Sequence, residues 1–225
     1  MKTKGTIRSI GTGRPLAVGN ILTNRISKLA LAALFLAALG LPARAVIAQD
    51  DADVEAKIAN ATSAGPLGIT TDATILDWAF DDNGKFEVLR PGTNAWFCLP
   101  DDPATPLNNP MCVDQVWLDW VYALFAGEAP TVTMPGFSYM YQGDDAASNT
   151  DPAATEPAPG EAWMRSGPHM MIVLPASVDL SGLSTVADTP EPWVMWAGTP
   201  YAHIMVPVGS TSDLPDMPAV PVEAP

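Results

Sequence analysis

The stretch VDQVWLDWVYALFAG, residues 113–127, is the most regular part of the chain. Its apolar residues return every three or four positions, which is the period of one face of a helix. Gly127 follows as a helix stop. We therefore predict an amphipathic helix here that buries Trp117 and Trp120. A tryptophan stripe at this spacing is typical of a core, and a ligand-stacking pair is the alternative.

Upstream of this helix, three short apolar segments are separated by turn signals. Residues 73–78 and 85–89 have strand composition, and the Asp-Asn-Gly of residues 82–84 between them is typical of a hairpin. A third strand is expected at residues 95–98, after a Pro-Gly turn. The three segments together predict an antiparallel meander.

Further strands and one more helix complete the predicted architecture. The remaining segments are a helix at 51–63 and strands at 131–142, 169–174 (HMMIVL), 193–196 (WVMW) and 201–206 (YAHIMV). The sum is a single α+β domain with a mostly antiparallel sheet of six or seven strands, two helices and long Pro-rich loops.

The first 48 residues have the pattern of an export signal. A basic segment precedes the apolar run of residues 29–41, which is too short to span a membrane. Small residues at signal-peptidase spacing follow at 43–45 and at 46–48, and an uncleaved anchor is the alternative. We predict a signal peptide over 1–48, a domain over 49–206 and a disordered Pro-rich tail over 207–225.

Beyond the signal, the chain is strongly acidic. All 25 acidic residues follow residue 49, against four basic ones, so the net charge of this part is about −21. Such a charge repels phosphate backbones and anionic lipid surfaces. It excludes nucleic acid and membranes as partners, beyond the signal peptide, and favours cations or a basic protein.

The two cysteines, Cys98 and Cys112, predict a disulfide. An even cysteine count in an exported protein favours pairing, and the 13 residues between them are rich in turn formers. The expected disulfide would hold together a loop that has no regular pattern of its own.

Both histidines of the chain lie in His-x-Met triplets, His169 with Met171 and His203 with Met205. Side chains alternate along a strand, so each pair shares a face. Imidazole and thioether ligands suit Cu(I). If the two strands are neighbours in matching register, a periplasmic copper site would result; ordinary core packing is the alternative.

A second candidate site lies in residues 143–162, a long polar stretch with Asp145, Asn149 and Asp151. Ordered loops of this length are often functional. A hydrolase site under this loop would require a histidine and a carboxylate within hydrogen-bonding distance. Because no nucleophile-elbow, dinucleotide or P-loop motif occurs, no reaction is assigned.

The stretches PGTNAWFCLPDDPATPLNNPMCVD, YQGDDAASNTDPAATEPAPGEAW, GPHMMIVLP and WVMWAGTPYAHIMVPV resemble a family of uncharacterised exported bacterial proteins. The resemblance covers residues 51–208. It implies a bacterial, exported setting and one intact domain, and it implies no catalytic residue.

Three functions from different classes are compatible with these patterns. The first is an exported binding or structural module, in the periplasm or outside the cell. The second is a periplasmic copper-binding protein that uses the two His-x-Met strands, and the third is a hydrolase with its site near residues 143–162. No cofactor is assigned; copper is the candidate, and zinc would need carboxylates such as Asp145 or Asp151 to join the histidines.

Overall fold

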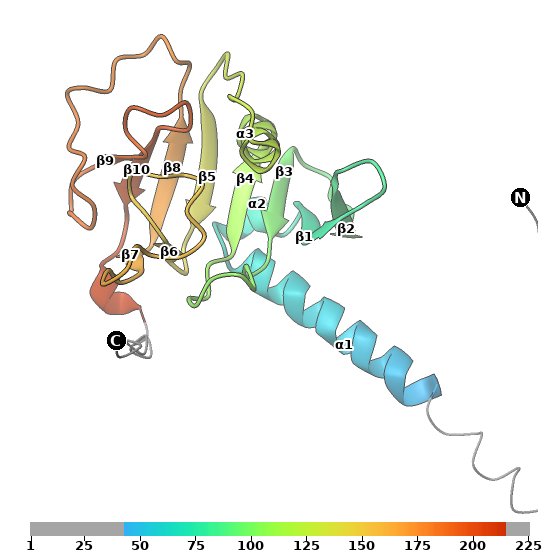
Figure 1. The fold of residues 1–225 in the computed structure, drawn as a ribbon. Helices are drawn as coiled ribbons and strands as arrows, with labels where there is room; N and C mark the ends of the chain where they lie inside the picture. Colours follow the sequence, from blue (N-terminus) through green and yellow to red (C-terminus); the bar gives the residue numbers. More distant parts are fainter. Residues whose placement is uncertain (1–42, 215–225) are drawn as a thin grey trace, which may run out of the picture. The chain divides into compact units, whose positions relative to one another are not determined.

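The computed structural model describes residues 43–214, which form an α+β fold (Figure 1). The signal-like segment up to residue 42 lies outside the described residues, and the two candidate cleavage sites fall in the first turns of α1. In chain order the elements are α1 (Ala43–Thr62), α2 (Leu67–Thr70), β1 (Thr74–Phe80), β2 (Phe86–Arg90), β3 (Trp96–Leu99), β4 (Met111–Asp114), α3 (Gln115–Ala126), β5 (Gly136–Met140), β6 (Asp144–Ala146), β7 (Met164–Ser166), β8 (His169–Val173), β9 (Trp193–Met195), β10 (His203–Pro207) and the 3-10 helix η1 (Thr211–Asp213).

Eight strands form one sheet in the order β2-β1-β3-β4-β5-β8-β10-β9, and β6 pairs with β7 in a separate two-stranded sheet. All neighbours in the large sheet are antiparallel except β1 and β3. The expected meander is therefore wrong, because β3 pairs with β1 and not with β2. The Pro-Gly turn crosses the start of β1, where Thr93 N donates to Asp72 O at 2.8 Å, and this crossing leads β3 to the free side of β1.

Other departures from the sequence prediction follow from short elements in turn-rich segments. β4 was missed because Met111–Asp114 runs directly into the helix. Residues 143–162 begin with β6, which pairs with β7 after the loop returns. Residues 207–214, predicted to belong to the disordered tail, include the last residue of β10 and η1. The rest of that tail lies beyond the described residues.

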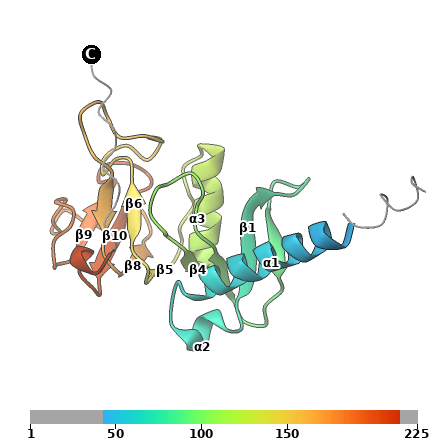
Figure 2. The same ribbon diagram turned by 90° about the horizontal axis from the view of Figure 1, so that it is seen from below.

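The sheet buries a different set of residues on each face. Figure 2 shows α2 and α3 on opposite sides of it. The larger cluster includes Trp117, Trp120 and four methionines, and the smaller cluster contains Ala61, Ile75 and the disulfide-bonded cysteines. The structure thus places the predicted disulfide under the face that does not carry α3, where it joins paired residues of β3 and β4.

Helix α3 begins and ends as predicted. The Asp114 carboxylate accepts a hydrogen bond from Trp117 N at 2.9 Å and so caps the first turn. Its second oxygen accepts from Phe137 N at 2.9 Å, which joins the helix start to β5. Gly127 ends the helix with a φ of 66°, in the left-handed region that favours glycine.

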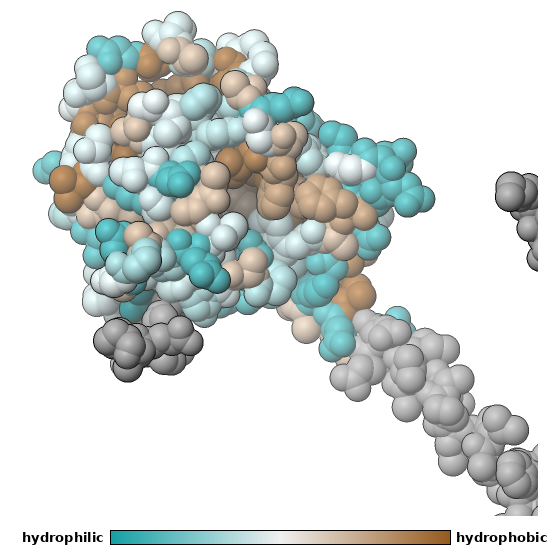
Figure 3. Space-filling model, in the orientation of Figure 1, coloured by the Kyte–Doolittle hydropathy of each residue, from teal (hydrophilic) through white to brown (hydrophobic). Residues whose placement is uncertain are grey.

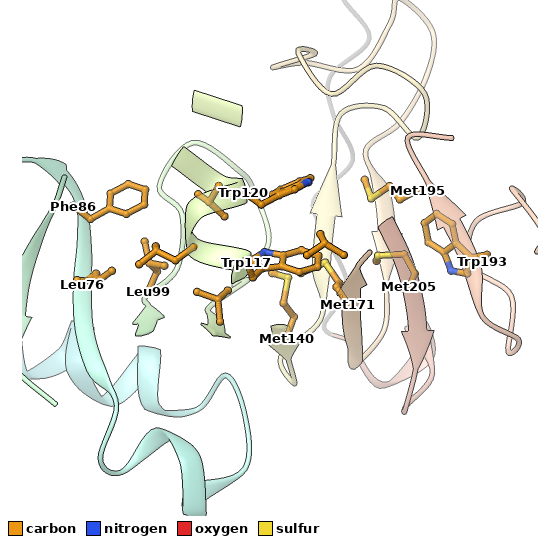
Figure 4. Packing of buried hydrophobic residues seen from close by; sticks show 14 residues of the cluster. Leu76, Phe86, Leu99, Trp117, Trp120, Met140, Met171, Trp193, Met195 and Met205 are labelled. Carbon is orange, nitrogen blue, oxygen red and sulfur yellow. The ribbon is translucent and has the colours of Figure 1, made fainter. Parts of the chain in front are cut away.

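The helix packs closely on the sheet at Gly136, the first residue of β5. A Cβ atom placed there would lie 2.9 Å from side-chain atoms of both Val116 and Val173. This approach brings the two indoles of α3 down onto the sheet, where Figure 4 shows Trp117 and Trp120 between Leu99 on one side and the methionines on the other.

None of the helices within residues 43–214 is long and apolar enough to cross a membrane.

Removing the disulfide will lower stability. In the chain-entropy model, a crosslink over a 14-residue separation contributes about 3 kcal/mol by restricting the unfolded chain. We expect a Cys98→Ala/Cys112→Ala double variant to lose about that much in urea unfolding. Reductant should weaken the wild-type protein and leave the double variant unchanged; equal stability of the two proteins would contradict the prediction.

The substitution Gly136→Ala will push α3 away from the sheet. Overpacking of this kind costs about 1–3 kcal/mol, measured as a lower urea midpoint. Gly182→Ala is the matched control, because a Cβ there meets nothing within 4 Å. Similar midpoints for the two variants would mean that the close approach at Gly136 does not constrain the fold.

Candidate functional site

A cavity of about 540 Å³ lies on the α3 side of the sheet. Its walls come from α3, from the sheet strands β4, β5, β8 and β9, from His203 of β10, and from residues 144–155, which include β6 and the start of the long polar segment. Figure 3 shows a hollow near the middle of the molecular face, next to the place that α3 occupies in Figure 1. Two of the three predicted loop residues, Asp145 and Asp151, therefore line the same cavity as His203, whereas Asn149 does not.

Aromatic side chains form much of the cavity wall. The rings of Trp120 and Trp196 stack with centroids 6.0 Å apart and an interplanar angle of 7°, and Tyr201 meets Trp120 edge to face at 5.9 Å. The full aromatic set is Trp78, Trp117, Trp120, Phe125, Trp163, Trp196 and Tyr201. The core prediction for the α3 tryptophans is confirmed, because both indoles belong to the buried cluster; the same two indoles also line the cavity.

Trp196 has an unusual backbone conformation. Its φ is 54°, in the left-handed region that bulky residues rarely adopt. Two hydrogen bonds hold it there: its backbone N donates to Asn149 O at 2.9 Å and its indole Nε1 donates to Ser148 O at 2.8 Å. A strained residue held by its surroundings is typical of a functional site.

Four carboxylates also line the cavity, and none of its described lining residues is Lys or Arg; the four are Asp102, Asp144, Asp145 and Asp151. Asp145 is 4% exposed and accepts hydrogen bonds from Leu107 N at 3.1 Å and Asn109 Nδ2 at 3.2 Å. Burial and the neighbouring Asp145 charge raise the pKa of Asp144 to about 7. The cavity thus carries negative charge that no basic lining residue offsets.

His203 contributes a free ring nitrogen to the cavity. Its Nδ1 lies 3.0 Å from Tyr201 O, and a carbonyl oxygen only accepts, so Nδ1 carries the proton and Nε2 has a lone pair. Nε2 is buried and has no hydrogen-bond partner among the described residues. Burial lowers the pKa of His203 to about 4, so the ring is neutral at pH 7.

The structure brings the two His-x-Met strands together with all four side chains on the α3 face. β8 and β10 are antiparallel neighbours, with Met205 opposite Met171 and Pro207 opposite His169. The two histidines are therefore four residues apart along the strand pair, about 13 Å. Met171 and Met205 meet, whereas His203 lines the aromatic cavity and His169 lines a second cavity of about 620 Å³.

The other loop residues have structural partners. Asn149 Nδ2 donates to Thr185 O at 2.9 Å, and the Asp151 carboxylate accepts from Ala153 N at 2.9 Å. Within residues 43–214 neither imidazole is hydrogen-bonded to a carboxylate. Both donate Nδ1–H to a backbone carbonyl, and neither Nε2 has a hydrogen-bond partner there. The pair that a hydrolase site requires is therefore not assembled there.

Within the same residues, no three His, Cys, Asp or Glu side chains cluster as a metal site built from those residue types would need. A site that uses methionine thioethers is not covered by this finding, because methionine is not one of those residue types. The residues that sequence reasoning missed are Asp144, Trp196 and Tyr201. Of these, only the WVMW pattern of residues 193–196 gave a signal, and it indicated a strand.

Compared with models of known protein families, with curated proteins and with solved structures, the chain matches none. The site must therefore be interpreted from its own residues.

The variant Asp144→Asn will stabilise the protein at high pH. The native carboxyl keeps its proton up to about pH 7, whereas the unfolded one loses it near pH 3.8. The Asp144 carboxyl therefore lowers the free energy of unfolding as pH rises through this window, and the loss is complete above pH 7. The full shift corresponds to about 4 kcal/mol at 1.36 kcal/mol per unit. Because this side chain is only partly buried, we expect about half of that at pH 8.

Urea unfolding at pH 4 and pH 8 measures this difference. The charges that raise the pKa of Asp144 are those of Asp145 and Asp102, and Arg165 is opposite Asp145 on β7. Glu87→Gln, at an exposed position outside the cavity, is the charge-matched control and should show little change at either pH. An Asp144→Asn effect of the same size at pH 4 and pH 8 would contradict the assigned pKa.

Proposed function

We propose that this chain is an exported binding protein that holds a small organic cation in the aromatic cavity. One observation carries the proposal: a single cavity combines seven aromatic side chains and four carboxylates, and its described lining contains no Lys or Arg. A volume of about 540 Å³ lies within the usual range for small-molecule sites, roughly 300–1,000 Å³.

The chemistry of the walls favours a positive charge on an apolar body. Aromatic faces attract cations, and recognition of quaternary ammonium groups by aromatic cages depends on this attraction. Carboxylates such as Asp144 and Asp151 add a longer-range attraction for the same charge. An anionic ligand would meet these carboxylates without a compensating basic group in the lining, so its binding is disfavoured.

Two further features support an exported binding protein. The N-terminal segment has the pattern of a signal peptide, and a disulfide such as Cys98–Cys112 persists in oxidising compartments. The net charge of the part that follows would raise the local concentration of cations. We assign binding because the lining supplies aromatic faces and carboxylates, both of which attract a positive charge.

Benzyltrimethylammonium is a suitable probe, with neopentylbenzene as the uncharged isostere and phenylacetate as the anion. We expect quenching of tryptophan fluorescence and measurable calorimetric affinity for the cation, weaker binding of the isostere and none of phenylacetate. Trp196→Leu should lower the affinity for the cation by about 2–30-fold, which corresponds to a cation–π contribution of about 0.5–2 kcal/mol.

The charge contribution has its own control. Asp144→Asn should lower the affinity for the cation. It should also remove the rise in affinity that we expect for the wild type between pH 6 and pH 8, as Asp144 ionises. Glu87→Gln removes one carboxylate outside the cavity and should leave affinity unchanged. Equal affinity for the cation and its uncharged isostere would refute a cation site, even if the cavity binds both.

A further inference from the structure

The strongest unexplained feature of the cavity is the imidazole of His203. It is 2% exposed, its Nδ1 proton is used by Tyr201 O, and its Nε2 lone pair has no partner among the described residues. A buried polar atom without a partner costs free energy, about 1–3 kcal/mol. A core position would be better filled by an apolar residue, so the free nitrogen indicates a ligand.

The protonation pattern of this ring is the one that metal-binding histidines use. Such residues usually donate one ring N–H to a backbone carbonyl or a carboxylate and bind the metal through the other nitrogen. In His203 the carbonyl of Tyr201 fixes both the tautomer and the ring orientation. Because its pKa is about 4, the nitrogen stays unprotonated at neutral pH, as a ligand must.

Four methionines line the cavity, and two of them, Met195 and Met171, lie on the strands next to His203. Met195 is directly opposite it on β9. Met171 on β8 is opposite Met205, which is two residues beyond His203, and so lies diagonally across from the imidazole. Directly opposite residues have Cβ atoms about 5 Å apart and diagonal ones about 7–8 Å, so flexible thioethers from both can approach one ion.

The immediate surroundings of this group are aromatic and apolar. Trp117, Trp120 and Trp196 each pack against the imidazole in a T-shaped arrangement, with ring centroids 5.4, 5.5 and 5.2 Å away. Met171 and Met195 are both buried, and Figure 4 shows them with Met205 on the same face of the sheet. A neutral set of one imidazole and two thioethers suits a soft monovalent ion far better than Zn²⁺ or Mg²⁺.

We propose that His203, Met195 and Met171 form a Cu(I) site at the sheet side of the cavity. The ion binds through Nε2 of the imidazole and the two thioether sulfurs, and the three indoles shield it from water. This site is independent of the organic-cation proposal, which depends on the carboxylates and the aromatic faces of the same cavity.

His169 provides an internal control. Its Nδ1 is 2.7 Å from Gly167 O and its Nε2 is also buried without a partner among the described residues. The second cavity, however, offers it a single thioether, that of Met205, and otherwise mostly hydroxyl, carboxylate and proline groups. The two histidines thus share tautomer and burial and differ in the number of sulfur ligands within the cavity.

The experiment is an anaerobic Cu(I) titration of the purified exported protein against bicinchoninate, a chromophoric chelator. We expect one equivalent to bind and to quench tryptophan fluorescence, with X-ray absorption showing one nitrogen and two sulfur neighbours. The affinity for Cu(I) should fall by more than about 10-fold in each of the variants His203→Ala, Met195→Leu and Met171→Leu. A loss of about 10-fold is the lower end of what removal of an outer-shell partner causes.

Matched variants separate the site from general packing. Met→Leu changes keep side-chain volume, so they remain informative if His203→Ala fails to fold. His169→Ala and Met164→Leu, the latter at a half-buried methionine of β7 that does not line the cavity, should keep wild-type affinity. The proposal is overturned if the protein does not compete with bicinchoninate, if Met195→Leu binds as the wild type does, or if His169→Ala loses as much as His203→Ala.

Discussion

The packing of α3 on the sheet at Gly136 determines most of this structure. With no side chain between them, the helix and β5 approach closely enough for Trp117 and Trp120 to reach the centre of the sheet. These two indoles are large and rigid. They leave part of the space between α3 and the outer strands unfilled. The cavity is the volume that they leave, and their faces become its inner wall.

Local chemistry predicted α3 and the longer strands, but not α2, β4, β6 or β7. Asp114, Gly127 and the helical spacing between them predicted α3, and the apolar strands that contain both histidines are present in the structure. The order of the strands was not predictable, because pairing between β1 and β3 depends on a turn crossing over Asp72 and not on either strand's composition. β4 was hidden because its residues run without a break into the helix.

Part of the candidate site was likewise predictable from the sequence, and part of it was not. The two-residue period of a strand correctly placed His203 with Met205, and His169 with Met171, on one face. It could not place Met195 beside His203, since that contact depends on the register between β9 and β10. The abundance of acidic residues also hid Asp144, whose raised pKa depends on burial beside Asp145. Thus the sequence indicates which residue types are available, and tertiary pairing decides which of them meet.

The strained conformation of Trp196 has a kinetic consequence. The same residue is a wall of the cavity and, through its backbone N and indole N–H, the attachment point of Ser148 and Asn149. Opening the cavity on this side breaks both hydrogen bonds and lets Trp196 relax to an ordinary backbone conformation, which offsets part of the cost. A molecule that leaves the cavity on this side would have to wait for this local opening, so the time that it stays bound would depend on a contact that the ligand itself does not make.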